Sequence, residues 1–299
     1  MPSAQHMASV ADDERHTPGA GALPLWNESF WFTGYDPEAE IGVILRAGAY
    51  PVQGTANLYL YLTHHGRVVH SIVDHALPPA PPAARRLTYT NGLDIEWEPR
   101  ERFALRYASG ANGFDLAWEG LSPTYLYPHP PDVPVEVVPR HIEHTGTVRG
   151  TVTIGGTAHR IDCLGHRDHS WGGERDWAKM HHWEYLNGEF GRDLWFHAVR
   201  VKLAGLDWIH IGCLWDGSEL HALDGIAIEG RTADGGTRQL AVDVHATDER
   251  RRPWHFVGDE ILVNCPVPFG RTWLKDAITR YLTGDRVGYG IYELGFVER

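Results

Sequence analysis

Lysine, cysteine and methionine are scarce in this sequence of 299 residues. Only three of its 27 basic residues are lysines, and none lies in a recognisable pocket motif, which disfavours Schiff-base chemistry. The three cysteines are odd in number and far apart, so we expect no disulfide framework. The simplest location for such a chain is the cytoplasm.

Long apolar runs and an excess of positive charge are also lacking. No apolar run is long enough to span a bilayer. The net charge of −12 repels phosphate, which disfavours nucleic acid and anionic membrane surfaces as partners. The polar stretch Met1–Leu23 has no apolar core of a secretory signal. We expect it to be a mobile tail whose deletion changes stability little.

Helical periodicity is nearly absent. The one candidate helix is Thr272–Leu282, where Trp273, Ala277 and Tyr281 fall four residues apart. Elsewhere apolar and polar residues alternate over short segments, which is the pattern of half-buried strands.

Turn signals between the alternating segments predict hairpins. Asn112-Gly113 lies between two such segments, and Gly155-Gly156 separates 147–154 from 157–161. Short strands at regular spacing predict an all-β fold, built from two antiparallel β-barrels or strongly curved sheets packed together, with little helix.

A proline-rich segment, Tyr127–Pro139, is the best candidate for a domain boundary. We therefore expect a tail over residues 1–23, a first barrel over 24–140 and a second over 141–299. The boundary itself is placed only within 127–165.

The stretch Gly165–Trp177 holds the densest group of reactive side chains. His166, Asp168 and His169 can all move protons, and Trp171 and Trp177 lie among them. A charged surface turn does not explain the tryptophans, and a metal site needs three or four converging ligands. We favour an acid–base site in which a glycine-flanked turn presents Asp168 and His169 to a tryptophan-walled pocket.

Two later segments repeat a Trp-x-His pattern. Residues 193–202 and 206–215 look like paired strands, with Trp195 and His197 on the first and Trp208 and His210 on the second. In a hairpin centred on the turn between them, both pairs share one face. Such a face suits the lining of a ligand cavity, although a hydrogen-bonded core histidine on each strand is the plainer alternative.

The central motif supports a family resemblance. Gly165-His166-Arg167-Asp168-His169-Ser170-Trp171-Gly172 resembles the Asp-His-x-Trp motif of the carotenoid 1,2-hydratase (hydroxyneurosporene synthase)-like superfamily. Asn27–Phe32 and Gly288–Glu293 resemble an uncharacterised bacterial branch of it. The resemblance implies two tandem lipocalin-like barrels, and chemistry without a redox cofactor on apolar molecules, often terpenoid or polyketide. The superfamily includes hydratases and proteins that promote cyclisation, and the fold alone does not decide which activity a member has.

This chemistry begins when a proton is placed on carbon. Asp168 is the first candidate acid and Glu28 the second, because burial raises the pKa of a carboxyl group. A neutral His169 or His197 can then accept a proton.

Further residues are expected to bind the substrate through aromatic faces or polar groups. They are His166, Trp171, Glu184, Trp195, Trp208 and His210.

We therefore expect a cofactor-independent, metal-free lyase (hydratase or dehydratase), cyclase or isomerase that acts at a C=C bond of a small apolar substrate. One alternative is a non-catalytic carrier of hydrophobic ligands. Another is a metal hydrolase using His166, His169 and a strand histidine. The sequence is also compatible with a homodimer.

Overall fold

The computed structural model describes residues 6–129, 139–203 and 205–298. Within these ranges the helical elements are three short 3₁₀ turns, η2 (Ala11–Asp13), η3 (Trp177–Lys179) and η4 (Asp234–Gly236), and there is no α-helix. No helix in the described ranges is long and apolar enough to cross a membrane. The all-β prediction is therefore confirmed.

The chain forms two compact units, Gln5–Arg175 and Asp176–Arg299. This division comes later in the chain than the expected one near residue 140. The reason is that two long strands after that point, β10 (Arg140–Ile154) and β11 (Thr157–Glu174), pair with strands of the first unit. Most of the proline-rich segment expected at the boundary, 130–138, lies outside the described residues.

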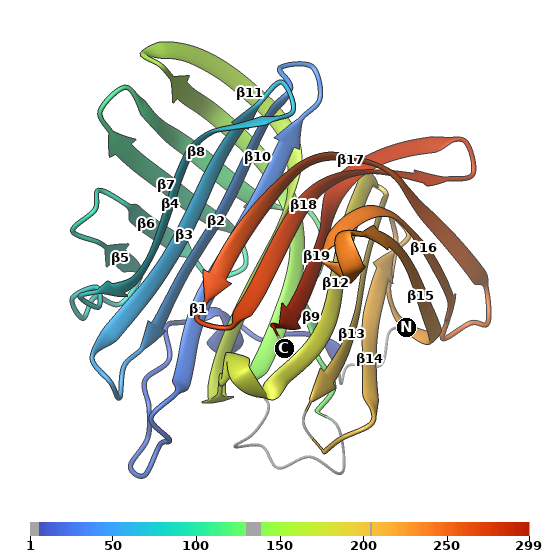
Figure 1. The fold of residues 1–299 in the computed structure, drawn as a ribbon, viewed down its shortest axis with the longest axis horizontal. Helices are drawn as coiled ribbons and strands as arrows, with labels where there is room; N and C mark the ends of the chain where they lie inside the picture. The colour runs from blue at the N-terminus through green and yellow to red at the C-terminus, as the bar shows by residue number, and fades with distance from the viewer. Residues whose placement is uncertain (1–5, 130–138, 204, 299) are drawn as a thin grey trace. The chain divides into compact units, whose positions relative to one another are not determined.

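The first unit is an antiparallel sheet of 11 strands that forms a half-barrel (Figure 1). Its strands are β1 (Trp26–Asp36), β2 (Ile41–Tyr50), β3 (Thr55–His64), β4 (Arg67–Leu77), β5 (Arg86–Thr88), β6 (Asp94–Glu98), β7 (Arg102–Ser109), β8 (Asn112–Gly120), β9 (Tyr125–Leu126), β10 (Arg140–Ile154) and β11 (Thr157–Glu174). Their order is β4-β3-β2-β1-β11-β10-β8-β7-β6-β5, with β9 on β10. Strands β1 and β11 therefore lie in the middle of the sheet.

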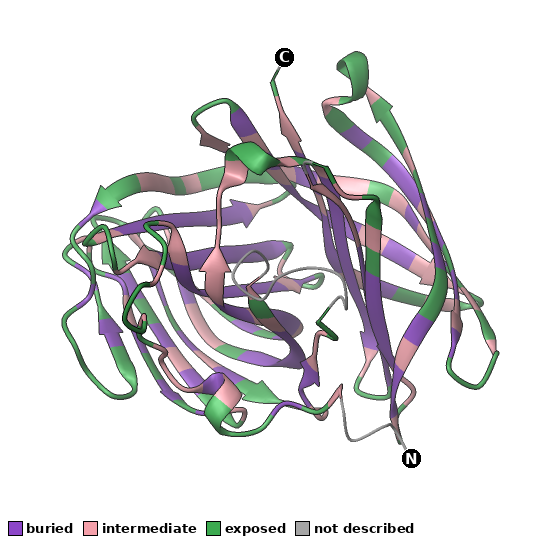
Figure 2. Cartoon of the chain, turned by 90° about the horizontal axis from the view of Figure 1, so that it is seen from below, coloured by how far each residue is buried: buried purple, intermediate pink, exposed green. Residues whose placement is uncertain are grey.

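Burial differs between the middle and one end of this sheet. Strands β6 and β7 alternate buried and exposed residues, as expected for strands with one face in water. Strands β1, β2 and β3 are buried on both faces over most of their length. Figure 2 shows buried residues concentrated in strands and exposed ones in many of the connecting turns. Polar side chains on β1 and β11 are thus removed from water.

The second unit is a closed antiparallel barrel of eight strands in sequence order. They are β12 (Met180–Gly191), β13 (Leu194–Leu203), β14 (Trp208–Trp215), β15 (Leu220–Ala233), β16 (Arg238–Asp248), β17 (Pro253–Phe269), β18 (Thr272–Thr283) and β19 (Arg286–Val297). Its core contains a stack of Phe196 on Phe256, with ring centroids 4.0 Å apart.

The helix predicted over Thr272–Leu282 is wrong, because this segment is strand β18. A spacing of four residues fits a helical repeat, but it is also a multiple of two. Trp273, Ala277 and Tyr281 therefore share one face of a strand equally well.

Both predicted hairpins form. Gly155 and Gly156 make the two-residue turn between β10 and β11, with φ of +57° and +84°. The β7–β8 hairpin turns at Gly110 and Ala111, two residues before the predicted Asn112-Gly113. Gly113 instead allows close strand contact, since a Cβ there would lie 2.4 Å from the Tyr107 carbonyl oxygen.

The segment expected to be a mobile tail is packed onto the first unit over much of its described length. The Ala8 N–H donates to the Thr124 carbonyl oxygen at 3.0 Å, and Met7 forms a bridge with Tyr125. Asp13 is fully buried. Its carboxylate is paired with Arg167, which belongs to the central motif on β11.

Candidate active site

The motif expected to be a turn lies inside strand β11. Side chains alternate along a strand, so His166, Asp168 and Ser170 lie on one face and Arg167, His169 and Trp171 on the other. Asp168 and His169 therefore cannot act together in one pocket. His166 and His169 likewise cannot share a metal ion. The two faces form two separate polar networks within the first unit.

On the His169 face, the N-terminal segment supplies a buried ion pair. Arg167 donates to the two carboxylate oxygens of Asp13 at 2.8 and 2.7 Å, and both side chains are fully buried. The Arg100 N–H donates to the same carboxylate at 2.5 Å. The guanidinium group also lies over the ring of Phe103, 4.4 Å from its centroid.

His169 lies between two carboxylates. Its Nε2 donates to Oε1 of Glu28 at 3.0 Å, and its Nδ1 lies 3.4 Å from Oδ1 of Asp13. The ring stacks on Phe30 with centroids 4.0 Å apart. Asp13, His169 and Glu28 thus form a continuous row of buried ionisable groups on one face of the sheet.

The charges in this chain are set by opposing effects of burial and pairing. Burial alone would lower the pKa of His169, but the Glu28 and Asp13 carboxylates raise it to about 9. Burial alone would raise the pKa of Glu28, but His169 and the hydrogen bond from His16 hold it below its ordinary value. The pKa of Asp13 is likewise held low, by Arg167 and His169. At neutral pH, His169 is an imidazolium ion and Glu28 is a carboxylate.

This assignment changes the expected role of Glu28. The sequence suggested a neutral acid, because aromatic residues surround the carboxyl group. The ion pair with His169 outweighs that burial, and Glu28 is instead an ionised carboxylate.

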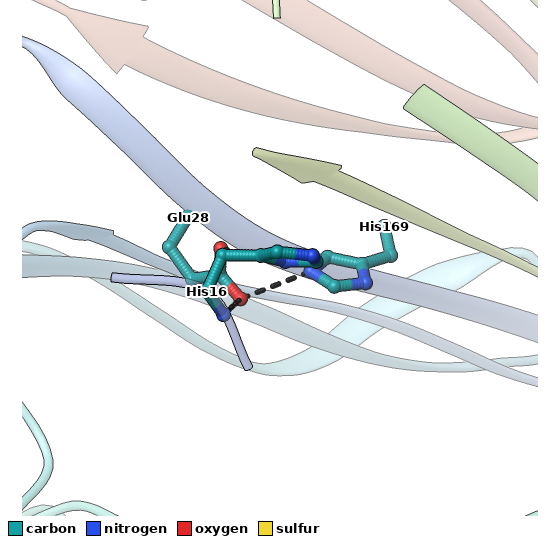
Figure 3. Close-up of side chains that lie close together, drawn as sticks. All are labelled: His16, Glu28 and His169. Atoms are coloured by element: carbon teal, nitrogen blue, oxygen red, sulfur yellow. Dashed lines mark hydrogen bonds and ion pairs between the residues drawn. The ribbon is translucent and has the colours of Figure 1, made fainter. Parts of the chain in front are cut away.

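His16 lies beside both Glu28 and His169 (Figure 3). Its backbone N–H donates to Oε1 of Glu28 at 3.1 Å, and its ring stacks on Trp171 with centroids 4.3 Å apart. Nε2 lies 3.1 Å from the carbonyl oxygen of Ala11, which can only accept, so Nε2 carries the proton in the neutral ring. The Nδ1 atom then presents a lone pair.

When the His16 ring is neutral, two acceptor atoms converge. Nδ1 of His16 and Oε2 of Glu28 lie 3.6 Å apart, and both are buried without a hydrogen-bond partner within the described ranges. Two acceptors cannot bond to each other, but together they can hold one O–H group. A buried polar atom without a partner is costly unless a ligand satisfies it.

A cavity of about 50 Å³ borders this pair. Much of its wall is apolar, from Phe30 on β1, from Ala47 and Ala49 on β2, and from Ala80 and Leu87. Its polar lining includes Arg15, His16, Thr17, Glu28 and Tyr89. An apolar wall with a few converging polar groups is the usual form of a small-molecule site.

The ligand atoms of His16, Glu28 and His169 lie within 4.8 Å of one another, which is close enough for a metal ion. A metal needs a neutral imidazole, whereas His169 is protonated at neutral pH. The charge state of these groups therefore fits proton transfer better than metal binding. A second such group, Asp243, His245 and His255, lies largely exposed on β16 and β17.

The opposite face of β11 holds Asp168 in another network. His141 Nε2 lies 3.7 Å from Oδ2 of Asp168 and 2.7 Å from Oε1 of Glu143. His166 Nε2 lies 2.8 Å from Oε2 of Glu143, and its Nδ1 is hydrogen bonded to Thr145. Burial raises the pKa of Asp168, against the effect of His141. This agrees with the expected direction for a buried acid.

The second unit does not place the two Trp-x-His pairs on a common face. Trp208 pairs with Lys202 and His210 with Arg200, whereas His197 pairs with Cys213. This register differs by one residue from the expected one, so Trp208 and His210 point away from the face of Trp195 and His197.

The burial of these side chains follows from the register. His197 and Trp195 are buried, whereas His210 is exposed and Trp208 is 42% exposed. Glu184 lies on the face of His210, accepts a hydrogen bond from Tyr292 at 2.7 Å and is paired with Arg200.

Sequence reasoning named His169 and Glu28 as candidates but did not name Asp13, His16 or Tyr89. Asp13 and His16 lie in a polar segment without periodicity, and no local pattern indicates that they pack against β11. Tyr89 follows a short strand at the end of the sheet and reaches the site only through the fold.

The fold and these buried acid–base groups define an all-β protein of lipocalin-like architecture. The chain belongs to the family described as Domain of unknown function (DUF7064), whose model matches residues 9–297. No curated protein matches the sequence.

Solved structures with a similar fold include the following three. A protein from Nitrosomonas europaea described as an AttH is 14% identical, with a TM-score of 0.66 over 95% of this chain and 99% of its own. CghA with Sch210972 is 12% identical, with a TM-score of 0.64 over 100% and 97%. Kievitone hydratase from Nectria haematococca is 12% identical, with a TM-score of 0.66 over 99% and 94%. These structures confirm the fold that the resemblance implied.

Proposed function

We propose that this protein is a cofactor-independent acid–base enzyme that adds water to, or removes it from, a C=C bond of a small apolar molecule. One observation carries the proposal. Oε2 of Glu28 and Nδ1 of His16 converge at 3.6 Å, buried and unpartnered within the described ranges, at the edge of a largely apolar cavity. Similarity to a fold that includes a hydratase supports the same class of reaction.

The two acceptors suit the activation of water. A water molecule that donates to both Glu28 and His16 keeps a lone pair for attack on carbon. As the C–O bond forms, one water proton passes to Oε2 of Glu28. The protonated carboxyl group then delivers a proton to the neighbouring carbon, which leaves Glu28 as a carboxylate again.

The same steps in reverse remove water. Protonated Glu28 gives its proton to the leaving hydroxyl group after the carboxylate has taken one from carbon, so atoms and charge balance in both directions. Cyclisation follows when a substrate hydroxyl group takes the place of water.

His169 and Asp13 are positioning residues in this scheme. The imidazolium ring of His169 bonds to Oε1 of Glu28, which leaves Oε2 as the carboxylate oxygen without a hydrogen bond. Asp13 in turn stabilises the imidazolium ion. This order of base, imidazole and second carboxylate fixes the orientation of the group that moves protons.

Asp168 supports a second candidate on the opposite face of β11. Its raised pKa and the adjoining His141–Glu143–His166 network suit a neutral acid that protonates an alkene. The carrier alternative needs a cavity but no proton transfer at either face.

Glu28→Gln and Asp168→Asn separate these candidates. Each variant is incubated in oxygen-18 water with a metabolite extract, and products that gain the label are identified by mass spectrometry. We expect Glu28→Gln to reduce labelling by at least about a hundredfold, the lower range for loss of a general base. The surface variant Glu38→Gln is the matched control and should retain labelling.

Two other outcomes would contradict the proposed role of Glu28. Loss of labelling in Asp168→Asn alone would move the chemistry to the other face. Wild-type protein that binds a ligand tightly and never produces a labelled product would identify a carrier.

A further inference from the structure

Tyr89 is a pocket residue to which the proposed reaction gives no role. It follows β5, where its N–H donates to the Leu93 carbonyl oxygen at 2.8 Å and its own carbonyl oxygen accepts from Gly92 at 3.2 Å. Gly92 has a φ of +93°, which favours glycine in this turn. The backbone that carries Tyr89 is therefore well defined.

The Tyr89 side chain is only 5% exposed and belongs to the apolar core of the first unit. Its hydroxyl group makes no hydrogen bond to any residue in the described ranges. Burial raises the pKa of this hydroxyl group to about 12, so it remains a neutral donor at physiological pH. The Tyr89 side chain lines the same cavity as Glu28, and within the described ranges its hydroxyl group is left without a hydrogen-bond partner there.

The size of the cavity restricts what can enter. A volume of about 50 Å³ is well below the roughly 150 Å³ of a cavity that holds benzene. The pocket therefore admits the reacting end of a molecule rather than a ring system. Within that space, a base and a neutral donor can contact the same short group of atoms.

We propose that the Tyr89 hydroxyl group donates a hydrogen bond to a carbonyl oxygen of the substrate, so that the substrate is an α,β-unsaturated carbonyl compound or its β-hydroxy product. This inference rests on the proposed function and names its substrate class. Water held by Glu28 and His16 attacks the β-carbon while Glu28 takes one of its protons. The C=C electron pair shifts to the bond between the α-carbon and the carbonyl carbon, and the C=O electron pair moves onto the oxygen to give an enolate. The enolate oxygen is stabilised by Tyr89. Glu28 then returns the water proton to the α-carbon.

Acetone and isobutene test the proposed oxygen site. They have nearly the same shape, but only acetone accepts a hydrogen bond. Both are titrated into the full chain and followed by NMR shifts of the Gly92 and Leu93 amides. Tyr89→Phe should weaken acetone binding about fivefold, as expected for one lost hydrogen bond, and leave isobutene binding within about twofold.

A stability measurement excludes a purely structural role. Tyr89→Phe removes no hydrogen bond from the ligand-free protein, so its melting temperature should stay the same or rise slightly. Tyr107→Phe is the matched control. Tyr107 belongs to the same apolar core, but its hydroxyl group is hydrogen bonded to His70 at 2.9 Å. Its loss should lower the melting temperature by a few degrees.

The results distinguish failure of the two proposals. Equal effects of Tyr89→Phe on acetone and isobutene, or none on either, would overturn the oxygen site even if Glu28→Gln abolishes labelling. A selective loss of acetone binding with full labelling by Glu28→Gln would retain the oxygen site and reject Glu28 as the base.

Discussion

Asp13→Asn should destabilise the first unit far more than its position near the N-terminus suggests. The carboxylate accepts two hydrogen bonds from Arg167 and one from the Arg100 N–H, and it lies beside protonated His169. Asparagine keeps the shape, but its NH₂ group faces a donor and its charge is gone. The Arg167 guanidinium is then fully buried without its partner.

Removing one partner of a buried ion pair costs about 3–5 kcal/mol. A unit of this size loses about 2–4 °C in melting temperature for each kcal/mol. We therefore expect a loss of about 6–20 °C, measured by differential scanning calorimetry at pH 7. Glu14→Gln is the control, because it removes a surface pair with Arg85 and should cost less than about 1 kcal/mol.

A double variant tests the cause. Asp13→Leu with Arg167→Met replaces the ion pair by apolar side chains and should recover much of the lost stability. Equal melting temperatures for Asp13→Asn and Glu14→Gln would refute the argument. Equal melting temperatures would also support the expectation that Met1–Leu23 is dispensable. The packing of Asp13 predicts the opposite.

Three further predictions concern charge and register. The pKa of His169 is raised from about 6.5 in the unfolded chain to about 9 in the folded protein. The contribution of His169 to the free energy of unfolding is therefore fully present below about pH 6.5 and is lost as the pH rises through about 9. The melting temperature should fall between pH 6.5 and 9.5, and a flat profile would contradict the His169–Glu28 ion pair. Glu28→Gln should flatten much of that fall, because it removes the nearest anion. His210→Ala should leave both stability and labelling unchanged, since the side chain is exposed; a large loss in either would restore it as a site residue.

Local patterns were sufficient for much of the fold. The Gly155-Gly156 turn and the alternation in the segment before Asn112 depend on neighbouring residues, and both were predicted correctly. The spacing over Thr272–Leu282 was misread because it fits two periodicities. Only the barrel around that segment decides between them.

The candidate site was predictable in part. His169 and Glu28 were found because each is a proton-transfer group among aromatic residues. Their separation from Asp168 was not predicted, although it follows directly once β11 is known to be a strand. The sign of the Glu28 pKa shift could not be obtained either, because it depends on an imidazolium partner far away in sequence.

The amino-acid sequence by itself determined the all-β class, the family motif and two of the groups that can transfer protons. These depend on composition and on contacts between near neighbours. The tertiary structure alone decided the one-residue register of β13 and β14, and it alone brought Asp13 and His16 to β1 and β11. Register and long-range pairing are set by which strands meet across the whole sheet, and the energy of a buried charge depends on the partner that it meets there.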